Sequence, residues 1–205
     1  DESRVAGSKR EQVDALISYD VGEHTPGAAV LVAQGDEALL EAAYGMANLE
    51  HDIPVTPDTI FRIGSVTKQF TAVGILLLEQ DGLLRVEDPI SKFLPDYPRG
   101  DEITLRHLLS HTSGIVEYTR APEFWSNIRL EMPHEEFTGV FRDKPLDFEP
   151  GAGWSYSNSG YHLLGIVIEN ASGMTYEEFM QSRVFSPLGL DDTGYDRPDR
   201  ILKRR

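Results

Sequence analysis

The sequence predicts an α/β chain in which a short antiparallel hairpin near the N-terminus is followed by a mostly helical region. Two β-type segments flank an early Gly-Asp turn, later segments show helical spacing with cap residues, and the apolar content is 40%. We predict one domain over residues 1–205, with the hairpin and a connector in 26–60 and a helical region in 61–195.

Composition narrows the possible functions. The 205 residues carry a net charge of −15, which disfavours binding to nucleic acids and to anionic membrane surfaces. The chain has no cysteine, so disulfides, thiolate catalysis and cysteine-ligated zinc are excluded. Its apolar runs, such as residues 74–78, are too short to span a bilayer, so no transmembrane segment is predicted.

The N-terminal segments favour a helix and then a hairpin. Apolar spacing in residues 11–21 is consistent with a short amphipathic helix. Residues 28–33 and 38–44 are β-type and are separated by a turn. Two prolines in 51–60 predict an extended connector. Because two strands alone are marginally stable, we expect further strands to pair with this hairpin.

The strongest predicted helix covers residues 65–80 and ends at an Asp-Gly pair. Its apolar residues surround the helix axis, which predicts burial on nearly every side. In the last predicted helix, Thr175 is the N-cap and Glu178 completes a capping box. The other predicted helices cover residues 104–110, 133–141, 160–170 and 175–182.

The first pair of candidate catalytic residues is Ser65 and Lys68. Positions three apart share a helix face, so the Lys68 amine can reach the Ser65 hydroxyl. A serine needs a base to attack a carbonyl, and a neutral lysine can serve as that base. The alternative reading is a helix-capping serine beside a surface lysine, and the pattern alone favours that alternative.

The second candidate group lies in a polar and aromatic stretch between Pro150-Gly151 and a predicted helix. Tyr156 carries a phenol that can transfer a proton when a nearby cation lowers its pKa. Asn158 offers both a donor and an acceptor, which suits the binding of an amide. The alternative is a loop with an asparagine cap and a packed tyrosine. Ser-x-x-Lys and Tyr-x-Asn each occur once in the chain, so together they carry more weight.

Longer motifs surround these residues. They are FRIGSVTKQFTA at 61–72, TLRHLLSHTSGI at 104–115 and EPGAGWSYSNSGY at 149–161. With them the chain, over residues 26–195, resembles the serine β-lactamase and penicillin-binding protein family. Within that family the resemblance is to the branch of class C β-lactamases, D-alanyl-D-alanine carboxypeptidases, D-aminopeptidases and related esterases. It implies a β-lactamase/transpeptidase-like fold, with an antiparallel sheet flanked by helices plus a helical region.

The resemblance also implies roles for the four residues. Ser65 would be the acylated nucleophile and Lys68 its base partner. Tyr156 would pass the proton to the leaving group and later activate water, while Asn158 would orient Lys68 and the substrate amide. The implied activity is hydrolysis of a small-molecule or peptide amide, β-lactam or ester, without a metal or organic cofactor. The implied location is periplasmic or secreted, with the cytoplasm as the alternative.

One expected motif is absent after Tyr156. The family carries a Lys- or His-led triplet ending in glycine on a strand that supplies one oxyanion-hole N–H. In this chain Asp192-Thr193-Gly194 has an acid where the base belongs. We therefore expect this chain to lack the C-terminal strands, to need a C-terminal segment or second chain to complete the fold, and to be inactive alone.

Other functions have weaker support in the sequence. There is no Gly-x-Ser-x-Gly motif for an α/β-hydrolase nucleophile. His107 and His111 lie four apart on a predicted helix, as a metal pair would, but we find no third ligand and favour a loop-supporting role for His111. The main alternative is a non-catalytic, penicillin-binding-like sensing or scaffold domain. Retention of all four candidate residues argues against it.

Overall fold

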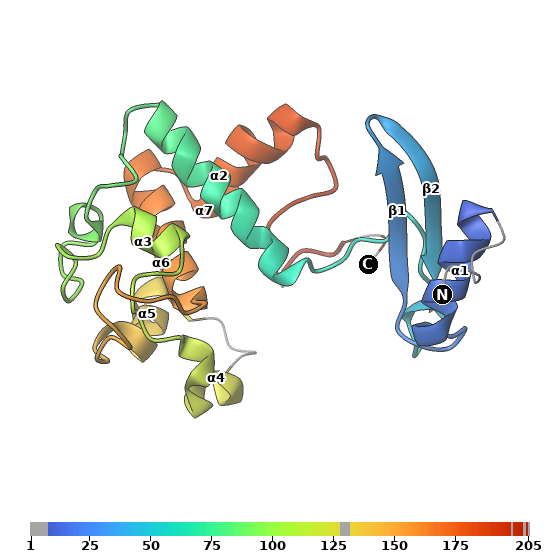
Figure 1. Cartoon of the computed structure of the whole chain (residues 1–205), viewed down its shortest axis with the longest axis horizontal. Coiled ribbons are helices and arrows are strands. Elements are labelled where there is room, and N and C mark those ends of the chain that lie inside the picture. The colour runs from blue at the N-terminus through green and yellow to red at the C-terminus, as the bar shows by residue number, and fades with distance from the viewer. Residues whose placement is uncertain (1–7, 128–131, 198, 203, 205) are drawn as a thin grey trace. The chain divides into compact units, whose positions relative to one another are not determined.

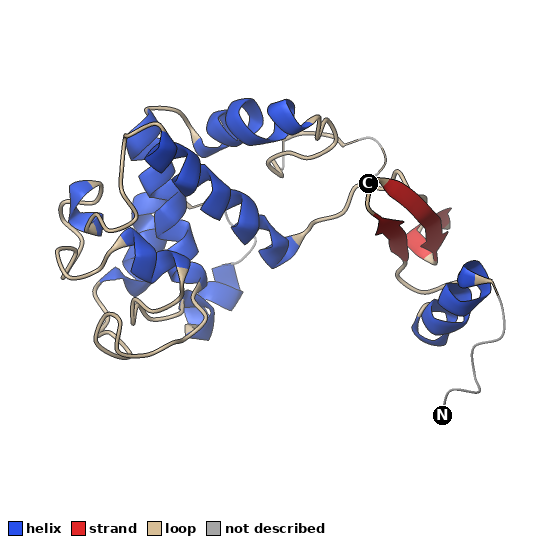
Figure 2. Ribbon diagram, turned by 45° about the horizontal axis from the view of Figure 1, so that its top comes forward, coloured by secondary structure: helices blue, strands red, loops and turns tan. Residues whose placement is uncertain are grey.

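A computed structural model describes residues 8–127, 132–197, 199–202 and 204. The chain divides into two compact units (Figures 1 and 2). Asp1–Arg62 together with Asp196–Arg205 form the first, which we call the hairpin unit. Ile63–Tyr195 form the second, the helical unit. Every strand in the described residues belongs to the hairpin unit, whereas the helical unit consists of helices, turns and loops.

The predicted hairpin is confirmed. Strands β1 (Ala28–Gln34) and β2 (Glu37–Tyr44) pair antiparallel around the Gly-Asp turn. A second, shorter pair joins β3 (Met46–Asn48) to β4 (Ile53–Pro54), and only β4 lies within the stretch predicted as an extended connector. Each of these sheets has two strands. Much of the main hairpin is exposed; Leu31, for example, keeps 66% of its surface accessible.

A single helix in the hairpin unit contacts the main hairpin. Helix α1 (Lys9–Asp20) begins at Ser8, whose side chain forms a capping box with the glutamate at the third helical position. The Tyr44 hydroxyl donates a hydrogen bond of 2.6 Å to Asp14 Oδ1, joining β2 to this helix. Tyr44 also pairs with Ala28 in the strand register, so the contact lies at the open end of the hairpin.

The helical unit contains six α-helices among the described residues, none of which is long and apolar enough to cross a bilayer. The sequence predicts five of them; α4 was missed because its six residues are too few to show a helical period. The helices are α2 (Thr67–Gln80), α3 (Leu105–Leu109), α4 (Pro122–Asn127), α5 (His134–Arg142), α6 (Asn158–Ser172) and α7 (Tyr176–Met180).

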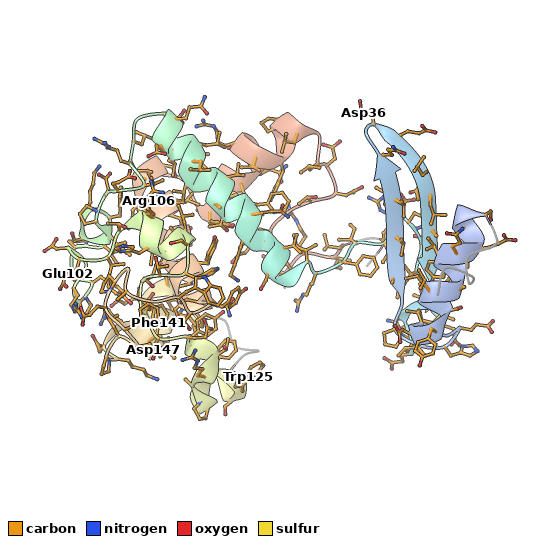
Figure 3. All side chains as sticks on the ribbon, viewed as in Figure 1. Asp36, Glu102, Arg106, Trp125, Phe141 and Asp147 are labelled. Carbon is orange, nitrogen blue, oxygen red and sulfur yellow. The ribbon has the colours of Figure 1, made fainter. Side chains whose placement is uncertain are left out.

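Helix α6 lies at the centre of the core of this unit and packs against α2, α3, α5 and α7 (Figure 1). Four of its apolar side chains are fully buried, as is Phe141 of α5, which is labelled in Figure 3. Burying a large apolar side chain contributes about 1.5–3 kcal/mol, so this packing holds the start of α6 firmly in place. The four side chains are Leu163, Leu164, Val167 and Ile168.

The prediction that the helix of α2 is buried on nearly every side is wrong. Val73 remains 42% exposed and Leu76 51% exposed, although both are apolar. An apolar sequence shows that a helix can be buried, but the elements packed around it decide which faces are covered. The α2 residues that are buried lie on one side: Thr71, Gly74, Ile75 and Leu78.

Candidate active site

All four predicted site residues meet within the helical unit. The Tyr156 hydroxyl donates to Ser65 Oγ at 2.7 Å, although the two residues are 91 positions apart. Lys68 Nζ lies 3.3 Å from the same Ser65 oxygen. It also donates to Asn158 Oδ1 at 2.6 Å. An amine and a phenol therefore converge on one alcohol, and an amide holds the amine from the other side.

Ser65 occupies a tight turn and not the first turn of the α-helix that the sequence predicts. Gly64–Val66 form a 3₁₀ turn, and α2 begins at Thr67. Gly64 has a φ of 51°, a conformation that glycine adopts at little cost. Because a 3₁₀ turn repeats every three residues, Lys68 still lies on the same side as Ser65. Ser65 is exposed to solvent.

His111 holds the segment that carries Tyr156. Its carbonyl accepts a 3.0 Å hydrogen bond from the Ser155 N–H, and its Nδ1 accepts one of 3.1 Å from the Ser157 N–H. Its ring packs beside Tyr156 at 4.7 Å between centroids and beside Tyr161 at 5.1 Å. The loop-supporting role that the sequence analysis favours for His111 agrees with these contacts.

The alternative of a metal pair at His107 and His111 rests on one continuous helix, and that expectation is wrong. Helix α3 ends at Leu109, and His111 follows with a φ of 61°. His107 turns back on its own helix, where Nδ1 accepts a hydrogen bond from the Thr104 N–H. Within the described ranges, no group of three or more His, Cys, Asp or Glu side chains is placed to hold a metal ion.

Charge near the phenol favours proton transfer. Partial burial raises the pKa of Tyr156, but hydrogen bonds with Lys68 and Ser65 and the positive charge of Lys68 outweigh it, so the net pKa is lower than usual. Lys68 Nζ lies 4.8 Å from the centre of the Tyr156 ring. Burial and the same lysine also lower the pKa of His111, which favours the neutral ring that accepts from Ser157.

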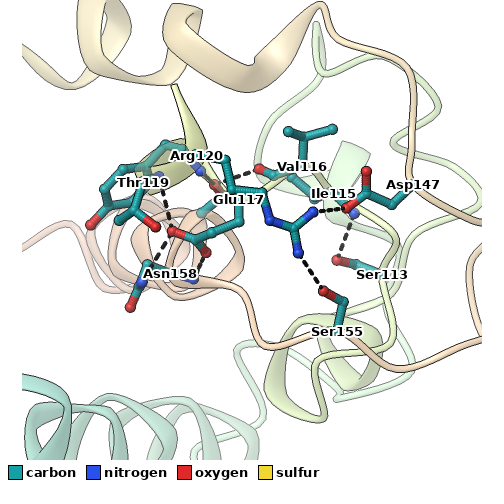
Figure 4. Close-up of polar contacts among 11 residues, drawn as sticks. Ser113, Ile115, Val116, Glu117, Thr119, Arg120, Asp147, Ser155 and Asn158 are labelled. Atoms are coloured by element: carbon teal, nitrogen blue, oxygen red, sulfur yellow. Dashed lines mark hydrogen bonds and ion pairs between the residues drawn. The ribbon is translucent and has the colours of Figure 1, made fainter. Parts of the chain in front are cut away.

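Asn158 is held at the start of α6 by a residue that the sequence analysis missed. Ser157 caps the helix by accepting from the Gly160 N–H at 3.0 Å. The Asn158 side-chain Nδ2 donates to Glu117 Oε1 at 3.0 Å, and its backbone N–H donates to Glu117 Oε2 (Figure 4). Glu117 is an acid in the apolar stretch that follows the Ser113-Gly114 pair, which was the available signal.

Ser65 and Tyr156 lie at the surface of the helical unit, whereas Lys68 and Asn158 are partly buried. Tyr156 remains 39% exposed. A cavity of about 280 Å³ in the same unit is lined by other residues, among them Tyr97, Phe141 and Arg142. That cavity contains none of the four side chains, so the hydrogen-bonding geometry, and not the cavity, identifies the site.

A known protein family matches nearly the whole chain. The family model for beta-lactamase matches residues 13–205. The chain belongs to the beta-lactamase family. This confirms the resemblance inferred from the motifs around Ser65 and Tyr156.

Curated relatives of this beta-lactamase family member include Penicillin-binding protein 4* of Bacillus subtilis (strain 168). It is 35% identical over 201 residues, which are 95% of this chain and 44% of the relative. Protein flp of Staphylococcus aureus (strain N315) is 28% identical over 207 residues, 98% of this chain and 41% of that relative. The chain thus spans less than half the length of these two relatives.

Solved structures confirm the fold. A penicillin binding protein from Bacillus halodurans aligns with a TM-score of 0.74 and 31% identity, over 86% of this chain and 56% of that one. The D-amino acid amidase from Ochrobactrum anthropi SV3, complexed with L-phenylalanine, aligns with a TM-score of 0.74 and 32% identity. The alignment covers 86% of this chain and 47% of the amidase chain. The chain therefore has a β-lactamase/transpeptidase-like, serine-hydrolase-type fold.

Proposed function

We propose that the protein is a serine hydrolase that works through an acyl-enzyme on Ser65. The observation that carries the proposal is the convergence of Lys68 Nζ at 3.3 Å and Tyr156 OH at 2.7 Å on Ser65 Oγ. Both distances allow proton transfer to or from the serine oxygen. A serine with two such neighbours can be deprotonated as it attacks a carbonyl carbon.

The proposed acylation moves one proton around this group. As Ser65 Oγ bonds to the carbonyl carbon, its proton passes to the Lys68 amine, which must be unprotonated for this step. The Tyr156 phenol gives its own proton to the leaving nitrogen or oxygen, so a phenolate and a lysine ammonium group remain beside the acyl-enzyme. In deacylation the phenolate takes a proton from water, whose oxygen attacks the ester, and the lysine ammonium group returns its proton to Ser65 Oγ as the acyl group leaves. The lowering of the Tyr156 pKa by Lys68 and Ser65 supports this exchange.

The proposed substrates are small molecules or peptides with an amide, β-lactam or ester bond. Asn158 would orient the substrate amide while it holds Lys68. The names of the relatives, which include penicillin-binding proteins and a D-amino acid amidase, support an acyl group of this kind. No organic cofactor or metal is needed for the proposed steps. An exported location, periplasmic or secreted, suits a substrate of this class.

We also propose that residues beyond this chain complete the site. The third motif, with its oxyanion N–H, has no counterpart after Tyr156 in the sequence. Loss of one oxyanion-hole donor costs about 2.7–4 kcal/mol of transition-state stabilisation. We therefore expect the 205-residue chain alone to turn over substrate far more slowly than the chain joined by a complementing C-terminal fragment. Equal turnover with and without that fragment would refute this part of the proposal.

Covalent labelling tests the function itself. The full product of the gene is treated with a fluorescent penicillin and, separately, with a fluorophosphonate probe. Labelling by either probe should be abolished by Ser65→Ala and retained in Ser182→Ala, which removes an exposed serine elsewhere in the helical unit. If the unmodified protein takes up neither probe, the non-catalytic sensing or scaffold function is supported instead.

A further inference from the structure

Glu117 is a buried carboxylate beside the candidate site. Its residue is only 6% exposed, although the side chain can carry a full negative charge. It precedes a short 3₁₀ turn, Tyr118–Arg120, and accepts from the Thr119 N–H at 3.1 Å. Burying a carboxylate is costly unless hydrogen bonds compensate for the lost water. The partners of this carboxylate therefore indicate what the burial achieves.

Two of those partners belong to Asn158. Glu117 accepts from the Asn158 backbone N–H and from its side-chain Nδ2, the latter at 3.0 Å (Figure 4). The other end of the same amide, Oδ1, accepts from Lys68 Nζ at 2.6 Å. The carboxylate, the amide and the amine thus form a continuous chain of hydrogen bonds that ends at Ser65, 3.3 Å from the amine.

This series of hydrogen bonds allows only one orientation of the Asn158 amide. An ionised carboxylate only accepts hydrogen bonds, and Lys68 Nζ can donate to the amide oxygen whether the amine is charged or neutral. An asparagine between them must direct its NH₂ at the carboxylate and its oxygen at the lysine. If the amide were reversed, its oxygen would face the Glu117 oxygen and its NH₂ would face the Lys68 N–H groups.

Capping of the 3₁₀ turn does not account for this arrangement. A side-chain cap needs one accepting oxygen, and Glu117 Oε1 already accepts from the Thr119 N–H. Capping alone therefore does not require the carboxylate to be buried. The two bonds to Asn158 reach across 41 residues of chain and are not needed for the turn.

We propose that Glu117 is a positioning residue for the acyl-transfer site. It sets the orientation of the Asn158 amide and, through that amide, keeps Lys68 Nζ beside Ser65. The inference rests on the proposed function, because it assigns Glu117 a role in the reaction of Ser65. Among the described residues, the Glu117 side chain hydrogen-bonds to Thr119 and Asn158 and not to Ser65, so it acts through Asn158.

The first test is Glu117→Gln in the full product of the gene, with the rate of fluorophosphonate labelling as the readout. Glutamine has the same size, but its NH₂ must face either the Asn158 backbone N–H or the Asn158 NH₂, so two donors oppose each other. We expect labelling to slow by about ten- to a hundredfold, the range for losing a hydrogen bond to a charged group. A labelling rate within about twofold of the unmodified protein would overturn the inference.

Asp147→Asn is the matched control. Asp147 pairs at 3.0 Å with Arg120, which lies on the turn that follows Glu117, and no dashed line in Figure 4 joins Asp147 to Asn158. Asp147→Asn is therefore the same kind of acid-to-amide substitution and loosens the same segment, but it leaves the Asn158 side chain undisturbed. Its labelling rate should stay within about twofold, since exposed ion pairs contribute little. Equal slowing in both variants would show a general effect on the segment and would overturn the positioning role.

A double-mutant cycle tests whether Glu117 acts through Asn158. In an Asn158→Ala background, Glu117→Gln should slow labelling by less than about threefold, because the amide that it positions is gone. Thermal unfolding of each variant checks that the fold persists. If the two effects multiply independently, Glu117 does not act through Asn158.

A readout without activity separates this inference from the proposed function. The Asn158 side-chain NH₂ signals in ¹⁵N NMR, assigned by their loss in Asn158→Ala, should exchange slowly with water in the unmodified protein. They should exchange at least about tenfold faster in Glu117→Gln. Unchanged exchange would overturn the positioning role, even if Ser65 labels normally. A protein that does not label but shows the expected exchange would refute the proposed function and leave the amide orientation supported.

Discussion

Replacing Tyr156 with phenylalanine distinguishes a proton-transfer role from a simple hydrogen bond. The change removes the hydroxyl that donates to Ser65 Oγ at 2.7 Å and keeps the ring that packs beside His111. A hydrogen bond alone is worth about 0.5–1.5 kcal/mol, which corresponds to roughly a two- to tenfold loss of rate. General acid–base catalysis contributes about 10²–10⁴-fold. The two roles therefore predict losses of different size.

The assay compares two substrates with the same acyl group in the full product of the gene. An amide leaving group needs a proton as the bond breaks, whereas p-nitrophenolate leaves without one. For Tyr156→Phe we expect acylation by the amide to fall by about 10²–10⁴-fold. Burst-phase acylation by the p-nitrophenyl ester should fall by less than about tenfold. Tyr195→Phe, which changes an exposed tyrosine of the same unit, serves as the control. Equal losses of less than tenfold for both substrates would refute the proton-transfer role.

Two further predictions concern the stability of the helical unit. Gly114 has a φ of 76°, and a Cβ there would lie 2.0 Å from the Phe148 carbonyl oxygen. Gly114→Ala should therefore lower the free energy of unfolding, measured by urea titration, by more than about 3 kcal/mol. Gly82→Ala, at a φ of 75° with no atom near the added Cβ, should cost only about 1–2 kcal/mol; equal losses in the two variants would contradict the clash. Burial, with the nearby His134, lowers the pKa of His162 from 6.5 to about 4. Between these two pH values the unfolded chain therefore binds more protons than the folded chain. The free energy of unfolding should fall as the pH drops through this window, by up to about 3 kcal/mol. His162→Phe should flatten the slope of unfolding free energy against pH between about 6.5 and 4. The control His51→Phe changes an exposed histidine and should keep that slope. An unchanged slope in His162→Phe would show that His162 does not cause the pH dependence.

Local sequence patterns predicted most of the secondary structure and half of the site geometry. The hairpin follows from two β-type segments around Gly35, and the capping box at Thr175 marks the start of α7. Ser65 and Lys68 lie three positions apart, so any helical turn brings them together. These features depend on neighbouring residues, and a linear pattern is enough to indicate them.

The remaining features depend on which distant segments pack together, and local patterns do not specify that packing. Tyr156 reaches Ser65 across 91 positions because α6 packs against α2, and no local period encodes that contact. The exposed face of α2 and the burial of Glu117 arise in the same way, since burial depends on the partner surface as well as on the residue. The order of the amino acids thus sets which groups are available for chemistry. Packing determined which of them meet, because side chains far apart in the chain are held within hydrogen-bonding distance only by the core beneath them.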